Sequence, residues 1–183
     1  MRRKDRKLED LPAWEVVDQA VFATLSTTNE DGIPYGIPIS FAREGNRIYM
    51  HGALQGQKME NLQRDPRVCL SFVGQVRVPE LTPEERLELQ EDPQSVRRLA
   101  SKLFTTQFSS ALIRGHCRIV EEPEEKIHAL ELLSRRYVPG NMEYFQEAAE
   151  MSLRVTAILS VDAQEITGKR KWYGADGKEE KGR

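Results

Sequence analysis

The chain has 183 residues, of which 39% are apolar, and this is enough for one globular domain with a substantial core. The formal net charge of -2 gives no reason to expect nucleic acid as a partner, and the basic clusters at the two ends are most simply solvated tails. No run approaches the ~20 apolar residues of a membrane span. No apolar signal segment follows the basic start either, so we expect a cytoplasmic protein without a membrane segment.

The first elements expected along the chain are a short helix and a hairpin. Residues 12–20 carry apolar side chains at helical spacing, and a strand follows over 21–27. Asp31-Gly32 supplies the positive φ that a hairpin turn needs. Further strands are expected at 33–42, 47–53 and 67–76, and runs this short predict a barrel.

The segment from Ile33 to Phe41 alternates strictly between bulky apolar residues and Pro, Gly or Ser. One face of such a strand can enter a core, while the other leaves bare backbone against which a flat ring can lie. Its two prolines delete hydrogen-bond donors, so an edge strand protected from pairing explains the pattern equally well.

The stretch from His51 to Lys58 joins a strand to a helix that stops at Asp65-Pro66. Lys58 falls in the first turn of that helix. The free backbone N–H groups of the turn, made approachable by Gly56, and the ammonium of Lys58 form a site suited to phosphate. Ordinary turn chemistry is the alternative explanation.

A helical insert is expected over 81–103. Thr82 to Glu85 forms a capping box, and an apolar face indicates docking, through Val96, Leu99, Ala100 and Leu103. Its charged half is either a solvated face or part of a lid over a pocket. A further helix is expected over 123–137, and a strand that could close the barrel over 153–161. A tail from about 168 to 183 completes the chain.

The histidines and cysteines do not have the spacing of metal ligands. Cys69 and Cys117 lie in apparent strands and are expected to be reduced core residues, and His128 is expected to be structural. We therefore expect no metal site.

Several of these segments resemble the nitroimidazole-resistance (Nim) branch of the pyridoxamine 5′-phosphate oxidase-like flavoproteins. The resemblance is sharpest at Tyr49-Met50-His51-Gly52-Ala53 with Gly56 and Lys58, and it includes residues 1–6, 31–41 and 65–70. Phe108, Ser110, Ala111 and Gly115 are similar to a Tyr-x-Ser-Val-x-x-x-Gly pattern of the family, from which Phe108 and Ala111 depart.

The resemblance implies a mainly β (α+β) fold, a flavin reductase-like split β-barrel with peripheral helices, which binds FMN at the interface of a homodimer. It implies an FMN-dependent oxidoreductase that reduces nitro compounds or related small electron-poor molecules. Lys58 would hold the phosphate, the backbone of Ile37, Pro38, Ile39 and Ser40 would line the isoalloxazine, and His51, Gly52 and Ala53 would lie beside it. His51 would contact substrate as the catalytic residue. Ser110 keeps a donor of the family pattern, and Lys169 and Trp172 would reach the partner's flavin.

Two alternatives stay open. One is a protein that binds flavin or haem to sense, store or sequester it without turnover. The other is pyridoxamine 5′-phosphate oxidase activity, against which the sequence offers the lack of a second basic cluster for a substrate phosphate.

Overall fold

The computed structural model describes residues 2–174 and 178–180. The chain forms two compact units, each described by itself below. The barrel unit comprises Ala20–Phe72 and Leu112–Ile166, and the second unit comprises Met1–Gln19, Val73–Ala111 and Thr167–Arg183. Parts of the expected tail, residues 175–177 and 181–183, lie outside the described residues.

The barrel unit is built on an antiparallel sheet whose pairing order is β3-β2-β6-β7-β8-β5-β4. The strands are β2 (Ala23–Thr28), β3 (Pro34–Ile39), β4 (Phe41–Glu44), β5 (Arg47–Ala53), β6 (Arg67–Arg77), β7 (Gln107–Ile119) and β8 (Thr156–Tyr173). Within the described residues the two end strands, β3 and β4, do not pair with each other, so the sheet is open, although only Ser40 separates them in the chain. This is the expected mainly β split barrel with peripheral helices.

Apolar side chains that point to the inside of the curved sheet form the core of the barrel unit. Those that are fully buried include Phe41, Ile48, Met50, Leu70, Phe72, Ile113, Leu159 and Val161. The rings of Phe41 and Phe72 meet edge to face, with 4.9 Å between their centres. The predicted alternation of buried and exposed side chains along β3 is confirmed only in part. Ile39 is buried, whereas Ile33 lies before the start of the strand and is exposed.

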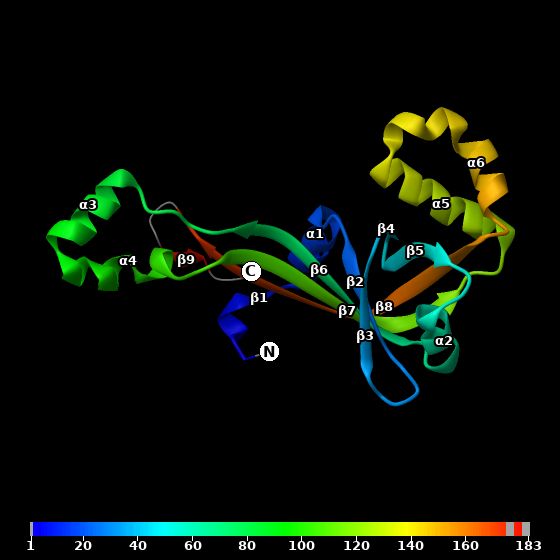
Figure 1. Ribbon diagram of the computed structural model, residues 1–183, viewed down its shortest axis with the longest axis horizontal. Helices are drawn as coiled ribbons and strands as arrows, with labels where there is room; N and C mark the ends of the chain where they lie inside the picture. Colours follow the sequence, from blue (N-terminus) through cyan, green and yellow to red (C-terminus); the bar gives the residue numbers. More distant parts are fainter. Residues whose placement is uncertain (1, 175–177, 181–183) are drawn as a thin grey trace. The chain divides into compact units, whose positions relative to one another are not determined.

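Helices cover the outside of this sheet. They are α2 (Gln57–Arg64), α5 (Pro123–Tyr137) and α6 (Phe145–Ser152), with a 3-10 turn over Pro139–Tyr144 before α6. α5 and α6 lie on one side of β4 and β5, and α2 lies on another (Figure 1). The predicted bounds of α5 are confirmed, with proline at its first turn, glutamates near its start and arginines near its end.

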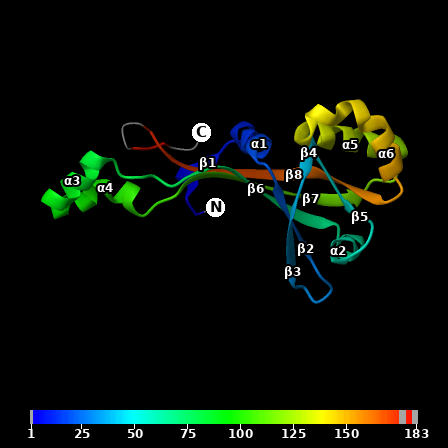
Figure 2. The ribbon, with the colours of Figure 1, turned by 45° about the horizontal axis from the view of Figure 1, so that its top comes forward.

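The second unit contains the remaining parts of β6, β7 and β8. Its other elements are a 3-10 turn (Lys4–Arg6), β1 (Lys7–Leu8), α1 (Asp10–Gln19), α3 (Pro83–Glu91), a 3-10 turn (Pro93–Ser95), α4 (Val96–Leu103) and β9 (Glu179–Glu180). β1 and β9 both pair with β8, and α1 lies beside β1 and β8 (Figure 2). Arg6 forms an ion pair with Glu179, which ties the start of the chain to β9.

The helical insert is present, but its predicted docking face is buried only in part. The capping box at Thr82 and Glu85 is confirmed. Leu99 is 3% exposed, whereas Val96 is 46% exposed and Ala100 is also exposed. α3 and α4 instead hold each other by ion pairs, such as that of Lys102 with Glu85 at 2.5 Å.

Two boundary predictions are corrected by β8. The predicted strand over 153–161 begins at Thr156 and continues to Tyr173, so residues 168–173 are strand and not tail. β8 also lies between β7 and β5 and therefore does not close the barrel. Within residues 2–174 and 178–180, no helix combines the length and apolar character needed to cross a bilayer.

Candidate functional site

The first turn of α2 has no side-chain cap. Gly56 precedes the helix with φ of +103°, a conformation that side chains rarely adopt, and no side chain accepts a hydrogen bond from the first turn there. The Gly56 carbonyl accepts the N–H of Met59 at 2.8 Å and that of Glu60 at 3.2 Å. The N–H groups before them are left for another acceptor, as the phosphate hypothesis requires.

Lys58, the second residue of α2, folds back over the end of β5. Its ammonium donates to the carbonyl oxygen of Ala53 at 3.3 Å. The Nζ atom lies 2.8 Å from the point where a Cβ on Gly52 would stand, so the absence of a side chain at Gly52 makes room for the cation. The sequence-predicted residues Gly52, Ala53 and Lys58 are therefore brought together.

The predicted bare strand is found at the edge of the sheet. β3 pairs with β2 and is one end of the pairing order. Pro34, Gly36 and Pro38 are exposed, Ile37 is half-buried and Ile39 is buried. Both sequence explanations of this strand hold in the structure, since it is an edge and its outer face is bare backbone.

His51 leaves β5 on the side that α5 covers. Its neighbour on the same face, Tyr49, donates a hydrogen bond to Glu125 of α5 at 2.9 Å. Side chains alternate along a strand, and Gly52 turns the other face of β5 toward Lys58. The imidazole of His51 and the ammonium of Lys58 therefore lie on opposite faces of β5.

A pocket of about 240 Å³ contains His51 and Ser40. Its other lining residues come from one face of α5 and the residue after it, namely Leu130, Leu133, Ser134, Tyr137 and Val138. The sequence analysis did not identify this pocket. Leu130, Leu133 and Tyr137 are spaced at i, i+3 and i+7, and this spacing does not distinguish a core contact from a pocket wall.

The pKa of His51 is lowered below its usual value of about 6.5. Partial desolvation is the larger cause, and the nearby charge of Lys58 lowers the pKa further. The imidazole is consequently neutral at pH 7, where one nitrogen donates and the other accepts a hydrogen bond.

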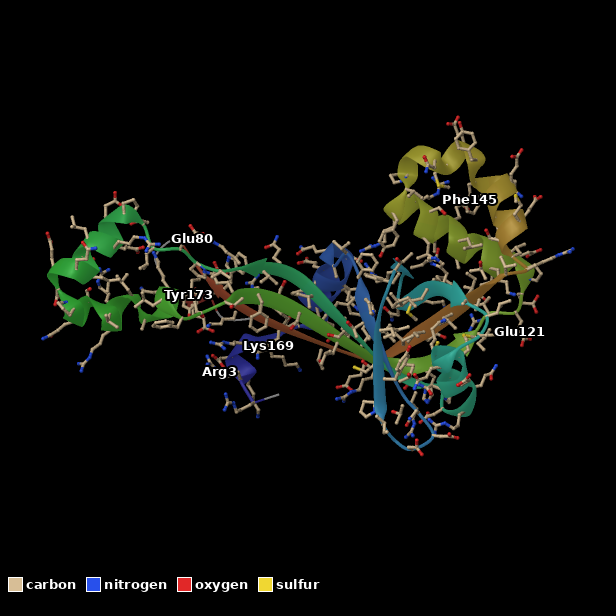
Figure 3. The ribbon with its side chains drawn as sticks, viewed as in Figure 1. Arg3, Glu80, Glu121, Phe145, Lys169 and Tyr173 are labelled. Carbon is tan, nitrogen blue, oxygen red and sulfur yellow. The ribbon has the colours of Figure 1, made fainter. Side chains whose placement is uncertain are left out.

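The three candidate residues of the second unit occupy two faces of its sheet. The ammonium of Lys169 lies 5.4 Å from the centre of the Phe108 ring, and Ser110 follows Phe108 on the same face of β7. Trp172 lies on the other face, where it lines a pocket with Leu8 and Val16. Figure 3 marks Lys169 and Tyr173 along β8 in this unit. The structure thus groups Lys169 with Ser110 and separates both from Trp172.

The other histidines have structural partners. His128 Nε2 lies 3.1 Å from both carboxylate oxygens of Glu44, and His116 Nδ1 lies 2.7 Å from Gln164 Nε2. The thiols of Cys69 and Cys117 are free. Within the described part of the chain, no group of three or more His, Cys, Asp or Glu side chains is arranged to hold a metal ion.

Three solved structures show the same fold at low sequence identity. A protein of Bacteroides thetaiotaomicron, provisionally assigned to 5-nitroimidazole antibiotic resistance, is 24% identical with a TM-score of 0.67, and the match covers 88% of this chain and 84% of that one. The flavocytochrome Anf3 of Azotobacter vinelandii is 19% identical with a TM-score of 0.68, covering 90% and 68%. An FAD and haem binding protein of Mycobacterium smegmatis is 18% identical with a TM-score of 0.67, covering 91% and 73%.

Comparison with curated proteins gives no match. A family model, in contrast, matches residues 9–170, which is most of the chain and includes every candidate site residue except Trp172. The open barrel, the bare edge strand and the uncapped helix start at Lys58 all lie within the matched residues. The chain belongs to the pyridoxamine 5′-phosphate oxidase family.

Proposed function

We propose that the protein binds FMN and is an oxidoreductase that reduces nitro compounds or related small electron-poor molecules, as in the Nim branch of the family. The observation that carries this proposal is the ammonium of Lys58, which lies over Gly52 beside the uncapped first turn of α2. A cation and unpaired N–H groups at one point suit a phosphate dianion. Relatives of the same fold include a flavocytochrome and an FAD and haem binding protein.

The residues present fit a flavin with a phosphate tail. Lys58 would bind the phosphate, and the backbone from Ile37 to Ser40 would support the ring on the bare outer face of β3. Gly52 and Ala53 would lie between these positions. The absence of side chains at the exposed Gly36 and the ring shape of Pro38 leave the strand flat enough for stacking.

A homodimer is part of the same proposal. Ser110 and Lys169 would act on the flavin of the partner from their shared sheet face, and Trp172 from the opposite face. Support comes from apolar side chains exposed on the strands of the second unit, such as Val73 at 56% and Val76 at 56%. Apolar surface of this kind marks interaction sites in many proteins.

A flavin held by these residues would supply the redox chemistry, with a reduced nicotinamide as the electron source and the nitro compound as the acceptor. Reduction of a nitro group to a nitroso group consumes two electrons and two protons and releases one water. His51 can donate a hydrogen bond to the acceptor from its neutral imidazole, and the two protons are supplied by solvent or by the protonated fraction of His51, which regains its proton from solvent. Ser40 and Ser134 are further neutral donors in the same pocket.

The test is a visible absorption spectrum of the purified protein after incubation with FMN and desalting. Retained flavin bands near about 450 nm support the proposal, and a colourless protein contradicts it. Reduced nicotinamide is then added without air, followed by a nitroaromatic acceptor. Bleaching followed by reoxidation is the expected sequence for a reductase.

A second candidate is a protein that holds flavin or haem without turnover. The observation that favours it is the likeness of fold to the two haem-associated proteins named above. A bound flavin that stays oxidised under excess reduced nicotinamide, or that bleaches but passes electrons to no acceptor, would favour this candidate over the reductase.

Oxidase activity on pyridoxamine 5′-phosphate is a third candidate. The pocket at His51 offers no basic side chain for a substrate phosphate, which argues against it. Direct assay of pyridoxal phosphate formation decides this point.

A further inference from the structure

The pocket at His51 is lined by uncharged residues. Its lining residues are Ser40, His51, Leu130, Leu133, Ser134, Tyr137 and Val138, and none of them is an acid, a lysine or an arginine. Its volume of about 240 Å³ is roughly eight times the ~30 Å³ share of one liquid water molecule. The pocket therefore has room for one small ring with a substituent.

The charged residues of α5 near the pocket are held elsewhere. Arg136 places its guanidinium 4.4 Å from the centre of the Phe41 ring and donates to the Ala20 carbonyl at 2.6 Å. Arg135 pairs with Glu131 one turn earlier at 2.6 Å. The Arg136 guanidinium also lies 5.8 Å from the centre of the Tyr137 ring, so Arg136 lies next to the pocket, but neither arginine is among its lining residues.

The hydroxyl of Tyr137 already forms two hydrogen bonds within the protein. It donates to the Val21 carbonyl at 2.7 Å and accepts the N–H of Phe41 at 3.1 Å. The polar groups left for a ligand are therefore the hydroxyls of Ser40 and Ser134 and the imidazole of His51. The lowered pKa of His51 keeps that ring neutral at pH 7.

We propose that this pocket receives the electron acceptor, and that Leu130 and Ser134 of α5 restrict it to small, flat, uncharged molecules. An anion, including any phosphorylated compound, would lose part of its hydration there, and no residue of the lining carries an opposite charge. An uncharged ring can pack on the leucines and accept or donate hydrogen bonds at Ser40, His51 and Ser134. The inference rests on the proposed function, because it takes the acceptor site of that reaction to be the pocket beside the bare strand.

The first experiment measures binding, so that its result does not depend on turnover. Nitrobenzene and 4-nitrobenzoate share one ring and differ by a carboxylate, and their affinities for the purified protein are compared by ligand-observed NMR. We expect nitrobenzene to bind at least about tenfold more tightly than the anion, because a buried anion without a partner is costly. Equal affinities, or no binding of nitrobenzene, would overturn the inference.

Two variants locate the effect in α5. Leu130→Trp fills the pocket and should reduce nitrobenzene affinity at least about tenfold, since overpacking excludes the ring. Ser134→Lys places a cation at the wall and should improve 4-nitrobenzoate affinity by about tenfold, while Ser134→Met, of similar length but uncharged, should not. Unchanged affinities in Leu130→Trp, or equal effects of lysine and methionine, would refute the role of these residues.

The same samples separate the two proposals. Flavin retention and bleaching by reduced nicotinamide report on the proposed function, and the affinity ratio of the two nitro compounds reports on the pocket. A protein that retains flavin but does not distinguish the two compounds retains the proposed function and loses this inference. A colourless protein that still prefers nitrobenzene loses the proposed function and the acceptor role of the pocket, and retains only the preference of the pocket for an uncharged ring.

Discussion

The ammonium of Lys58 lies in the space left by the missing side chain of Gly52. The Nζ atom would stand 2.8 Å, and Cε 3.0 Å, from a Cβ at that position. In the structure the ammonium donates to the Ala53 carbonyl, and no carboxylate of the described residues forms a salt bridge with it. Gly52 is thus a spacer that fixes where the cation of the proposed phosphate site can lie.

Lys58→Met should weaken FMN binding about 10- to 100-fold, because a hydrogen bond to a charged group contributes about 1.5–3 kcal/mol. Gly52→Ala should weaken it in the same direction by displacing the ammonium, with little effect on folding because a flexible side-chain end can move. Titration of flavin fluorescence measures both. Lys4→Met removes an exposed lysine of the chain start and is the control. Full FMN affinity in Lys58→Met would place the phosphate elsewhere.

His51 should titrate below its usual pKa of about 6.5, and Lys58→Met should raise its pKa toward that value without restoring it, since desolvation remains. NMR titration of the imidazole protons measures this shift. The folded protein binds fewer protons at His51 than the unfolded chain, so the stability falls as pH drops below about 6.5 and continues to fall through the lower pKa of the folded state. A titration midpoint at or above 6.5 would show that neither desolvation nor the charge of Lys58 lowers the pKa of His51.

His51→Ala should retain flavin but lose turnover of the nitro acceptor, and this variant separates cofactor binding from chemistry. Absorbance after desalting reports the flavin, and anaerobic reoxidation by the acceptor reports the turnover. His116→Ala, which replaces an exposed histidine of β7, is the matched control. Turnover that matches the original protein would remove His51 from the mechanism.

Close packing of α1 on β8 predicts a stability effect in the second unit. A Cβ on Gly168 would lie 2.7 Å from the Cβ of Ala13 and 2.8 Å from that of Leu8. Gly168→Ala should therefore destabilise the protein by about 1–3 kcal/mol. Gly140→Ala, where a Cβ would meet nothing within 4 Å, is the control. Urea unfolding followed by circular dichroism compares them, and equal midpoints would show that α1 can retreat freely.

Local signals predicted the elements whose start and stop residues agree. The helix over 123–137 has proline and glutamates at its start and arginines at its end, and its observed bounds are the same. Gly32 has a positive φ, as the predicted turn at Asp31-Gly32 requires. Lys58 lies in the first turn of its helix because Gly56 begins it.

The features that the sequence could not supply depend on contacts between distant segments. β8 continues to Tyr173 through charged residues because β1 and β9 pair with it, and no local pattern announces that pairing. The apolar residues of the insert predicted which face of the helix would dock, but not which segment it would contact. Val96 on that face is in fact exposed. The wall that α5 gives to the His51 pocket arises from anchors such as the Tyr49 and Glu125 hydrogen bond, which join residues 76 positions apart.

The two thiols should be inert in the folded protein, and Cys117 more so than Cys69. Burial raises the pKa of Cys117 to about 12, and burial likewise raises the pKa of the half-buried Cys69. Since an unfolded thiol ionises near pH 8.5, the folded state holds these protons longer, and the stability contributed by the two thiols declines as pH rises above about 8.5. Labelling with a chromogenic disulfide at pH 8 should be slow for Cys69 and should reach Cys117 only on unfolding in urea. Cys117→Ala assigns the slow phase to Cys69, and rapid labelling of both thiols without urea would show that the β7 region opens far more readily than its packing implies.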